Sequence, residues 1–164
     1  MGNYKSIHRI GKDEINIKKS NFISLAAPVK TEEEANEFIE ENRRTYKDAN
    51  HNCYAYVLGE EKLIQKAGDD GEPSQSAGLP ILEVIKREDL TDVCVVVNRY
   101  FGGIKLGKGG LSRAYAHGAK ACLDDGLIVD KVLCLDVKLT IAYQFLGMVE
   151  NYLLNEKYYI KDKV

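Results

Sequence analysis

Residues 93–97 read Val-Cys-Val-Val-Val, a continuous apolar run that is almost entirely β-branched. Such a run predicts a strand buried on both faces, because a strand with one solvated face would alternate apolar and polar side chains. A strand of that kind needs structure packed on each side of its sheet. The run therefore constrains the chain to a fold in which helices are layered on a central sheet.

Local patterns predict the other elements of the first 125 residues. Thr31, followed three residues later by Glu34, is a capping-box signature for the start of a helix. Strands come first along the chain and βα units come later, an order typical of an α+β fold, here an α/β sandwich. The expected strands are 4–10, 13–18, 21–29, 52–58 and one around 62–66, and the later helices run from Ser76 or Gly78 to about 87 and from about 110 to 125.

The pattern changes near Asp130. Residues 133–143 predict a strand, 144–154 an amphipathic helix, and Tyr158 the start of a second strand. A β-α-β piece of roughly 35 residues cannot bury a core of its own. It either docks on the first domain or is half of a domain that the chain lacks, so we expect domains at 1–129 and 130–164.

Composition excludes several classes of protein. Apolar residues make up 45% and charged residues 29%, which is ordinary for a soluble globular chain. The net charge of −2 excludes a histone-like binder that is basic all over. The longest uncharged run, 139–149, is too short to span a membrane, and we see no secretory signal. Four widely separated cysteines then indicate reduced thiols, so we expect a cytoplasmic protein that does not bind membranes.

The small net charge conceals a segregation by sign. From Glu60 to Asp92 there are nine acidic and four basic side chains, a net of −5. From Val93 to Leu123 there are five basic side chains and no acidic one. The positively charged segment, 93–123, contains a glycine-rich loop.

Six of the 14 glycines fall between Gly102 and Gly118, where the buried strand leads into a helix. Glycines let a ligand approach the backbone, and the N-terminus of a helix favours anions. The loop nearly matches a P-loop, but Gly109 stands where that motif needs Ser or Thr to hold magnesium. The alternative is a tight connection that glycines merely pack. The candidate anion-binding residues are Arg99, Gly102, Gly103, Lys105, Gly107, Lys108, Gly109, Gly110 and Arg113.

The helix after this loop has two distinct faces. Arg113, His117 and Lys120 follow helical spacing, so they share one face and either extend the positive field of the loop or are simply solvated. The packed face is expected to carry Leu111, Tyr115, Gly118 and Cys122.

Two further groups of residues carry chemistry. Asp69, Asp70 and Glu72 place three carboxylates within four residues, which suits either a metal site or a turn with side-chain hydrogen bonds; we assign no metal there, because no known ligand spacing is present. His51 and Cys53 lie two apart and share a strand face, the arrangement of a conceivable nucleophilic dyad, although such neighbours rarely reach each other.

Six segments together resemble the IMPACT/YigZ family. They occur in the family's order between about residues 10 and 125, and a match of this length is highly specific for the family. They are 19–23 (KSNFI), 51–56 (HNCYAY), 69–74 (DDGEPS), 77–82 (AGLPIL), 95–103 (VVVNRYFGG) and 106–115 (LGKGGLSRAY).

The resemblance implies a first domain similar to ribosomal protein S5 domain 2, and a C-terminal segment that looks like the first half of a ferredoxin-like domain. Eukaryotic relatives are linked with regulation of translation under stress, through a partner of the initiation-factor kinase. The chain departs from the family at Gln75, where the family usually has glycine. The resemblance also implies that the second half of the ferredoxin-like domain is missing from this sequence.

We therefore expect a non-catalytic protein that binds RNA, the ribosome or a translation-regulatory partner through the glycine loop, with no cofactor. The rival hypothesis is an enzyme or nucleotide-binding protein in which the same loop holds a phosphate and Asp69, Asp70 or Glu72 supplies the chemistry. A third is an interaction domain whose loop is purely structural. The sequence leaves the oligomeric state open.

Overall fold

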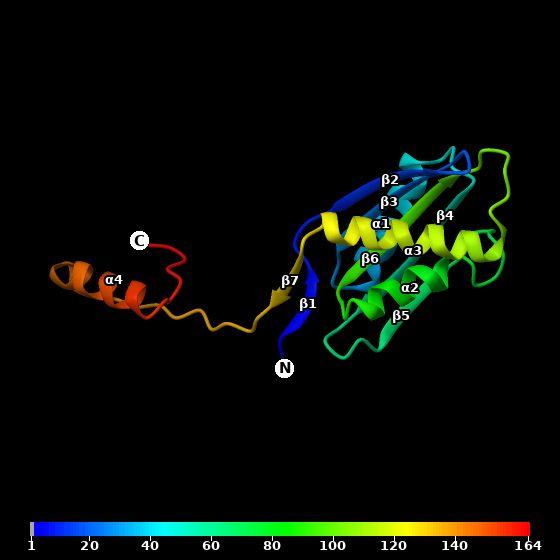
Figure 1. Cartoon of the computed structure of the whole chain (residues 1–164). Helices are drawn as coiled ribbons and strands as arrows, with labels where there is room; N and C mark the ends of the chain where they lie inside the picture. The colour runs from blue at the N-terminus through cyan, green and yellow to red at the C-terminus, as the bar shows by residue number, and fades with distance from the viewer. Residues whose placement is uncertain (1) are drawn as a thin grey trace. The chain divides into compact units, whose positions relative to one another are not determined.

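The computed structural model describes residues 2–164, which form two compact units (Figure 1). The first unit ends at Leu133 and holds both sheets and three long helices. The second, Cys134–Val164, holds one helix.

A five-stranded antiparallel sheet is the centre of the first unit, with strand order β2-β3-β6-β4-β5. The valine-rich strand β6 lies in the middle, as a strand buried on both faces should. The strands predicted at 13–18, 21–29, 52–58 and around 62–66, and the one containing the run 93–97, are thereby confirmed, with shifts of a few residues at their ends. Their bounds are β2 Gly11–Ile17, β3 Ser20–Pro28, β4 His51–Leu58, β5 Ile64–Gly68 and β6 Val93–Tyr100.

Helices cover both faces of this sheet (Figure 1). Helix α1 (Glu32–Thr45) packs on one face, in a core that includes Cys94 and Val96. Helices α2 (Gly78–Arg87) and α3 (Gly107–Asp125) pack on the other, in a core that includes Val93, Val95 and Val97. Because successive strand residues point to opposite faces, every residue of the run is buried. The layered α+β fold is confirmed.

The helices begin partly as predicted. The Thr31 hydroxyl accepts a hydrogen bond from the Glu34 N–H at 3.2 Å, while the Glu34 carboxylate accepts from the Lys30 N–H at 2.7 Å. The prediction that Ser76 or Gly78 caps α2 is wrong, because the Ser76 hydroxyl donates to the Pro73 carbonyl instead. Helix α3 begins at Gly107, three residues before the predicted start.

The packed face of α3 is the predicted one. Gly118 lies in close contact with β3, since a Cβ at this position would lie 2.2 Å from Ser24 Oγ. A larger residue would therefore require the Ser24 hydroxyl to move. The buried residues of α3 include Leu111, Tyr115, Gly118 and Cys122.

The end of the first unit differs from the sequence prediction. Strand β7 (Ile128–Lys131) pairs antiparallel with β1 (Tyr4–Ile7), so residues on both sides of the expected boundary at 129/130 belong to one small sheet. The sequence pattern did not predict β7.

The second unit contains a short 3₁₀ turn, Tyr143–Phe145, followed by helix α4 (Leu146–Asn155), which confirms the predicted helix. The two strands predicted around it, at 133–143 and from Tyr158, are wrong: within the part of the chain that the structure describes, neither segment is a strand. None of the helices described is long and apolar enough to cross a bilayer.

Candidate functional site

The glycine loop leads into the N-terminal end of α3 with its backbone exposed. The first N–H groups of any helix lack partners within the helix, and here no side chain caps them. Gly103 and Gly107 have φ of +92° and +73°, and a Cβ at either position would meet open space. Gly102 differs, since a Cβ there would lie 1.8 Å from the Lys19 carbonyl oxygen. Gly102 is therefore needed for packing, whereas Gly103 and Gly107 shape an open loop.

Three of the predicted cations surround this helix end. Lys105, Lys108 and Arg113 are exposed, and within residues 2–164 none of them forms an ion pair. The Arg113 guanidinium reaches back along the helix, because its Nη1 lies 3.3 Å from where a Cβ of Gly109 would be. The sequence therefore brings three uncompensated charges to the first turns of α3.

The basic face of α3 does not extend to Lys120. Its Nζ lies 2.6 Å from Asp124 Oδ1 and 3.5 Å from Glu88 Oε2. The hydrogen bond that Lys120 donates to Asp124 and the nearby acidic charges raise the pKa of this lysine. Lys120 is thus compensated by its neighbours.

A groove of about 300 Å³ lies between β2 and α3, beside Arg113. Lys18 and His117 join Arg113 at its wall, and no acidic side chain lines it. The groove thus places an apolar surface next to the basic N-terminal end of α3. Its apolar lining consists of Ile15, Ile17, Leu106 and Ala114.

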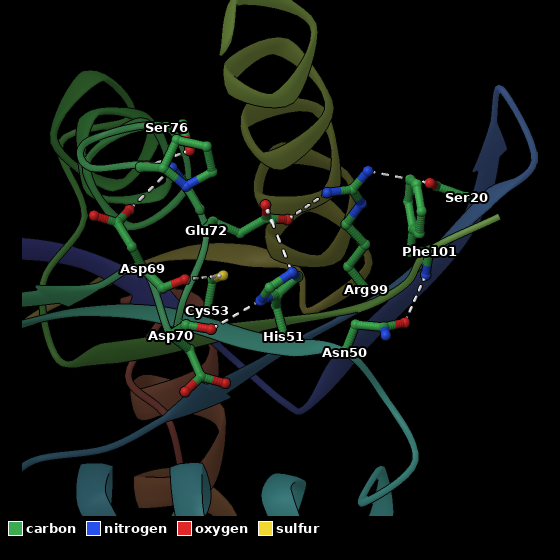
Figure 2. Close-up of polar contacts among 12 residues, drawn as sticks. Ser20, Asn50, His51, Cys53, Asp69, Asp70, Glu72, Ser76, Arg99 and Phe101 are labelled. Carbon is green, nitrogen blue, oxygen red and sulfur yellow. Dashed lines mark hydrogen bonds and ion pairs between the residues drawn. The ribbon is translucent and has the colours of Figure 1, made fainter. Parts of the chain in front are cut away.

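Arg99 does not join this exposed group. It is 5% exposed, and its guanidinium donates from Nη1 to Glu72 Oε1 at 2.7 Å and from Nη2 to Ser20 Oγ at 3.3 Å (Figure 2). The positive charge of Arg99 is paired with Glu72 inside the protein. The expectation that Arg99 contacts phosphate therefore does not fit its position.

Glu72 is the centre of a buried polar cluster. Besides Arg99, the Tyr115 hydroxyl donates to Glu72 Oε1 at 2.7 Å. His51 Nε2 lies 3.7 Å from the other carboxylate oxygen, and His51 Nδ1 is 2.9 Å from the Asp70 carbonyl (Figure 2). Burial, more than any other cause, raises the pKa of the Tyr115 hydroxyl, so it stays protonated and remains a donor. The cluster holds the 69–77 loop, β4, β6 and α3 together.

The other two carboxylates of this loop bind backbone groups. Asp69 Oδ1 accepts from the N–H groups of Ala77 at 3.1 Å and Gly78 at 2.8 Å, and its Oδ2 accepts from Gln75 at 2.9 Å. Asp70 Oδ2 accepts from the Asn52 N–H at 2.7 Å. Asp69 therefore caps α2 from a distance, and the contacts of both residues agree with the turn interpretation.

His51 and Cys53 do share a strand face, but they contact the 69–72 loop rather than each other. The Cys53 thiol donates to the Asp69 carbonyl at 3.0 Å. Burial raises the pKa of this thiol, an effect opposite to the activation that a nucleophilic cysteine needs.

Phe101 is a residue that sequence reasoning missed. It is 45% exposed at the start of the glycine loop, and its N–H donates to Asn50 Oδ1 at 2.8 Å. Its ring lies against the Arg99 guanidinium, 5.3 Å from ring centroid to Cζ. An aromatic residue directly before two glycines at the end of a buried strand was the available signal.

Comparisons with known proteins agree with this fold. The family model of the Impact N-terminal domain matches residues 18–123. The chain is 46% identical to IMPACT family member YvyE of Bacillus subtilis (strain 168), over 99% of the chain and 75% of that protein. It is 42% identical to IMPACT family member YigZ of Escherichia coli (strain K12), over 65% of the chain and 53% of that protein.

One solved structure resembles most of the chain. It is described as the crystal structure of an hypothetical protein and superposes with a TM-score of 0.76 at 32% identity, over 94% of this chain and 76% of the other. The chain spans about three quarters of the Bacillus relative and about half of the Escherichia relative. With the domain match and these relatives in agreement, the chain belongs to the IMPACT family.

Proposed function

We propose that this protein is a non-catalytic, cytoplasmic, translation-linked RNA-binding protein. Its binding surface is the N-terminal end of α3 with Lys105, Lys108 and Arg113. The observation that carries the proposal is the absence of ion pairs at these three cations within residues 2–164, around an uncapped helix end. A helix N-terminus and unpaired cations together favour phosphate groups.

The surroundings favour single-stranded RNA over a lone phosphate. Single strands bind through cations that follow the backbone and aromatic rings on which bases stack. Phe101 supplies such a ring at the start of the same loop, already held by Asn50 and Arg99. The groove beside Arg113 adds an apolar surface bordered by cations. The resemblance to a family linked with regulation of translation supports a role connected with translation.

The carboxylate contacts weigh against the enzyme hypothesis. Asp69 and Asp70 are occupied by backbone N–H groups, and Glu72 is buried with Arg99. A catalytic carboxylate must instead reach a substrate. The glycine loop is thus more useful for binding than for catalysis.

Charge reversal tests the proposal. Lys108→Glu with Arg113→Glu should abolish binding of a fluorescently labelled single-stranded RNA at low salt, because phosphate contacts supply most of the affinity. The matched control is Arg44→Glu with Lys47→Glu, which changes the net charge equally at exposed positions at the end of α1 and just after it. Equal affinity of the two variants would refute the proposed surface.

Two further measurements separate the alternatives. Phe101→Ala should weaken RNA binding while leaving its salt dependence unchanged, since stacking involves no counterion release. Nucleotides with magnesium should not raise the melting temperature at millimolar concentration. A clear rise, with RNA affinity absent, would favour a nucleotide-binding protein instead.

A further inference from the structure

Two lysines form the turn between β2 and β3. Ile17 pairs with Ser20, so Lys18 and Lys19 make up the whole of a two-residue hairpin loop. Their φ angles are +44° and +65°, in the left-handed region that favours glycine. Hairpin loops with positive φ at both positions usually carry Asn-Gly, because these residues tolerate that backbone. A Lys-Lys sequence in this turn therefore costs the protein stability.

The side chains of Lys18 and Lys19 are exposed and uncompensated. In the part of the chain that the structure describes, neither lysine forms an ion pair. Backbone strain tends to be retained where a residue serves function rather than stability. The strained turn thus presents two positive charges that are available to a ligand.

The turn is held directly against the glycine loop. Ser20, which follows Lys19, is buried, and its hydroxyl accepts a hydrogen bond from Arg99 Nη2 at 3.3 Å (Figure 2) and another from the Gly102 N–H at 3.4 Å. The Gly102 backbone also lies against that of Lys19, and the hairpin tip lies beside the loop in Figure 1. The turn, the loop and the start of α3 therefore form one continuous basic surface.

The groove between β2 and α3 joins the turn to the helix. It is lined by Lys18 from the turn and by Arg113 and His117 from α3, over an apolar floor. Its volume of about 300 Å³ is at the lower end of the range for small-molecule sites. It therefore accommodates one small group rather than the row of side chains that a docked helix inserts. A group that suits it combines an apolar part with a negative charge, as a nucleotide does with its base and phosphate.

The groove is formed wholly within the first unit. Its residues come from the end of β2, the turn and the first half of α3. The start of β2 lies at the opposite end of α3, where a Cβ on Gly11 would lie 2.4 Å from the Gly126 nitrogen. The chain continues into β7 from that opposite end.

We propose that this groove takes one nucleobase of the bound RNA strand, while Lys18, Lys19 and Arg113 bind the phosphates on either side of that base. The inference rests on the proposed function, which requires only that the start of α3 binds RNA. It adds the β2–β3 turn and the groove to that surface. A second base stacks on Phe101, at the start of the same loop.

Replacing the turn sequence separates its cost from its role. Lys18→Asn with Lys19→Gly gives the loop residues that its backbone favours, so the melting temperature should rise. The same change should reduce the magnitude of the slope of log K against log salt concentration for single-stranded RNA by about 1.4, because two phosphate contacts of about 0.7 each are lost. The control Arg44→Gln with Lys47→Gln removes the same charge at exposed positions and should leave the slope nearly unchanged. A lower melting temperature would refute the strain, and an unchanged slope would refute the role of the turn.

An RNA without bases tests the groove. The full chain is titrated with labelled oligouridine and with an abasic oligomer of the same length, which keeps the phosphates. The ratio of the two affinities should fall about fivefold or more in Ile17→Ser, the effect of one lost base contact. The control is Ile64→Ser, which alters a half-exposed isoleucine of another strand and should keep the ratio. Partial unfolding of either variant lowers both affinities alike, so it leaves the ratio unchanged.

The outcomes distinguish this inference from the proposed function. A wild type without affinity for RNA refutes the proposed function itself. A wild type that binds RNA, with the same ratio as Ile17→Ser, refutes only the groove. If an acidic peptide containing phenylalanine binds the wild type but not Ile17→Ser, while the nucleobase ratio stays the same, the groove takes a protein segment and the inference is overturned.

Discussion

Glu72 and Arg99 form an ion pair inside the protein, with Arg99 Nη1 2.7 Å from Glu72 Oε1 and side chains that are 3% and 6% exposed. The pair joins the 69–77 loop to the central strand β6, and Tyr115 ties it to α3. The glycine loop connects β6 to α3, so these contacts hold both ends of the loop in place. The role of the pair is thus to position the loop, while the exposed cations remain available for a ligand.

Removing Glu72 should be costly. Glu72→Ala leaves the Arg99 guanidinium buried without a counter-charge, which typically destabilises a protein by about 3–5 kcal/mol. The control is Glu88→Ala, which removes a partly exposed pair with Lys120 and should cost at most about 1 kcal/mol. Urea denaturation followed by circular dichroism measures both. Similar losses in the two variants would contradict the structural role of Glu72.

Asp69 should stabilise α2 although it lies nine residues before Gly78. Asp69→Ala removes the acceptor of three backbone N–H groups, those of Gln75, of the N-cap residue Ala77 and of Gly78, the first residue of α2. Loss of a helix cap costs about 0.5–2 kcal/mol, and we expect the upper end of that range. Ser76→Ala should cost less, because its hydroxyl does not cap the helix. If urea denaturation ranks these variants in reverse, the capping assignment is wrong.

Gln75 occupies a backbone conformation that favours glycine. Its φ is +62°. A left-handed backbone costs a residue with a side chain about 1–2 kcal/mol of stability. Replacing it by glycine removes this cost, but glycine loses more conformational entropy on folding, which offsets part of the gain. Gln75→Gly should therefore raise the free energy of unfolding by about 0.5–1 kcal/mol. Ser74→Gly, where φ is not positive, should not. If Gln75→Gly lowered the free energy of unfolding, the backbone of Gln75 would not be strained.

The protein should lose stability at alkaline pH. Burial raises the pKa of Tyr56 to about 12, with a further contribution from its hydrogen bond to Glu32, and burial also raises the pKa of the Cys94 and Cys122 thiols. In the unfolded chain these groups ionise near their ordinary values, about 8.5 for Cys and 10 for Tyr. The unfolded state therefore loses protons first. Stability is complete below about pH 8.5 and falls as the pH rises toward 12.

Urea denaturation at several pH values, under reducing conditions, measures this loss. Tyr56→Phe should make the fall between pH 10 and 12 shallower, because one of the titrating groups is gone. A free energy of unfolding that is constant from pH 8 to 11 would contradict the burial of these groups.

Local patterns predicted the layered fold because they reflect forces that act within a segment. The run at 93–97 required a strand covered on both sides, and Thr31 with Glu34 marked a helix start from four residues alone. The strand expected at 133–143 failed for the converse reason. An alternating pattern shows that a segment can be a strand, but a strand also needs a partner to pair with.

The site was harder to predict because its contacts cross the sequence. Asp69, Asp70 and Glu72 look equivalent in the sequence, yet two bind backbone N–H groups and the third turns inward to Arg99. The sequence did contain one signal that Arg99 is buried. Arg99 has the same strand parity as Val95 and Val97, which places it on the face covered by α2 and α3. A charge on that face requires a buried partner, although only the structure shows that the partner is Glu72.

The salt dependence of RNA binding tests the central claim most directly. Each phosphate contact to single-stranded RNA contributes about 0.7 to the slope of log K against log salt concentration. Replacing Lys105, Lys108 and Arg113 by Gln should therefore reduce the magnitude of that slope by about 2. The same replacement at exposed Arg44, Lys47 and Lys66 should leave it nearly unchanged. Equal slopes for the wild type and the first variant would show that these cations do not contact RNA.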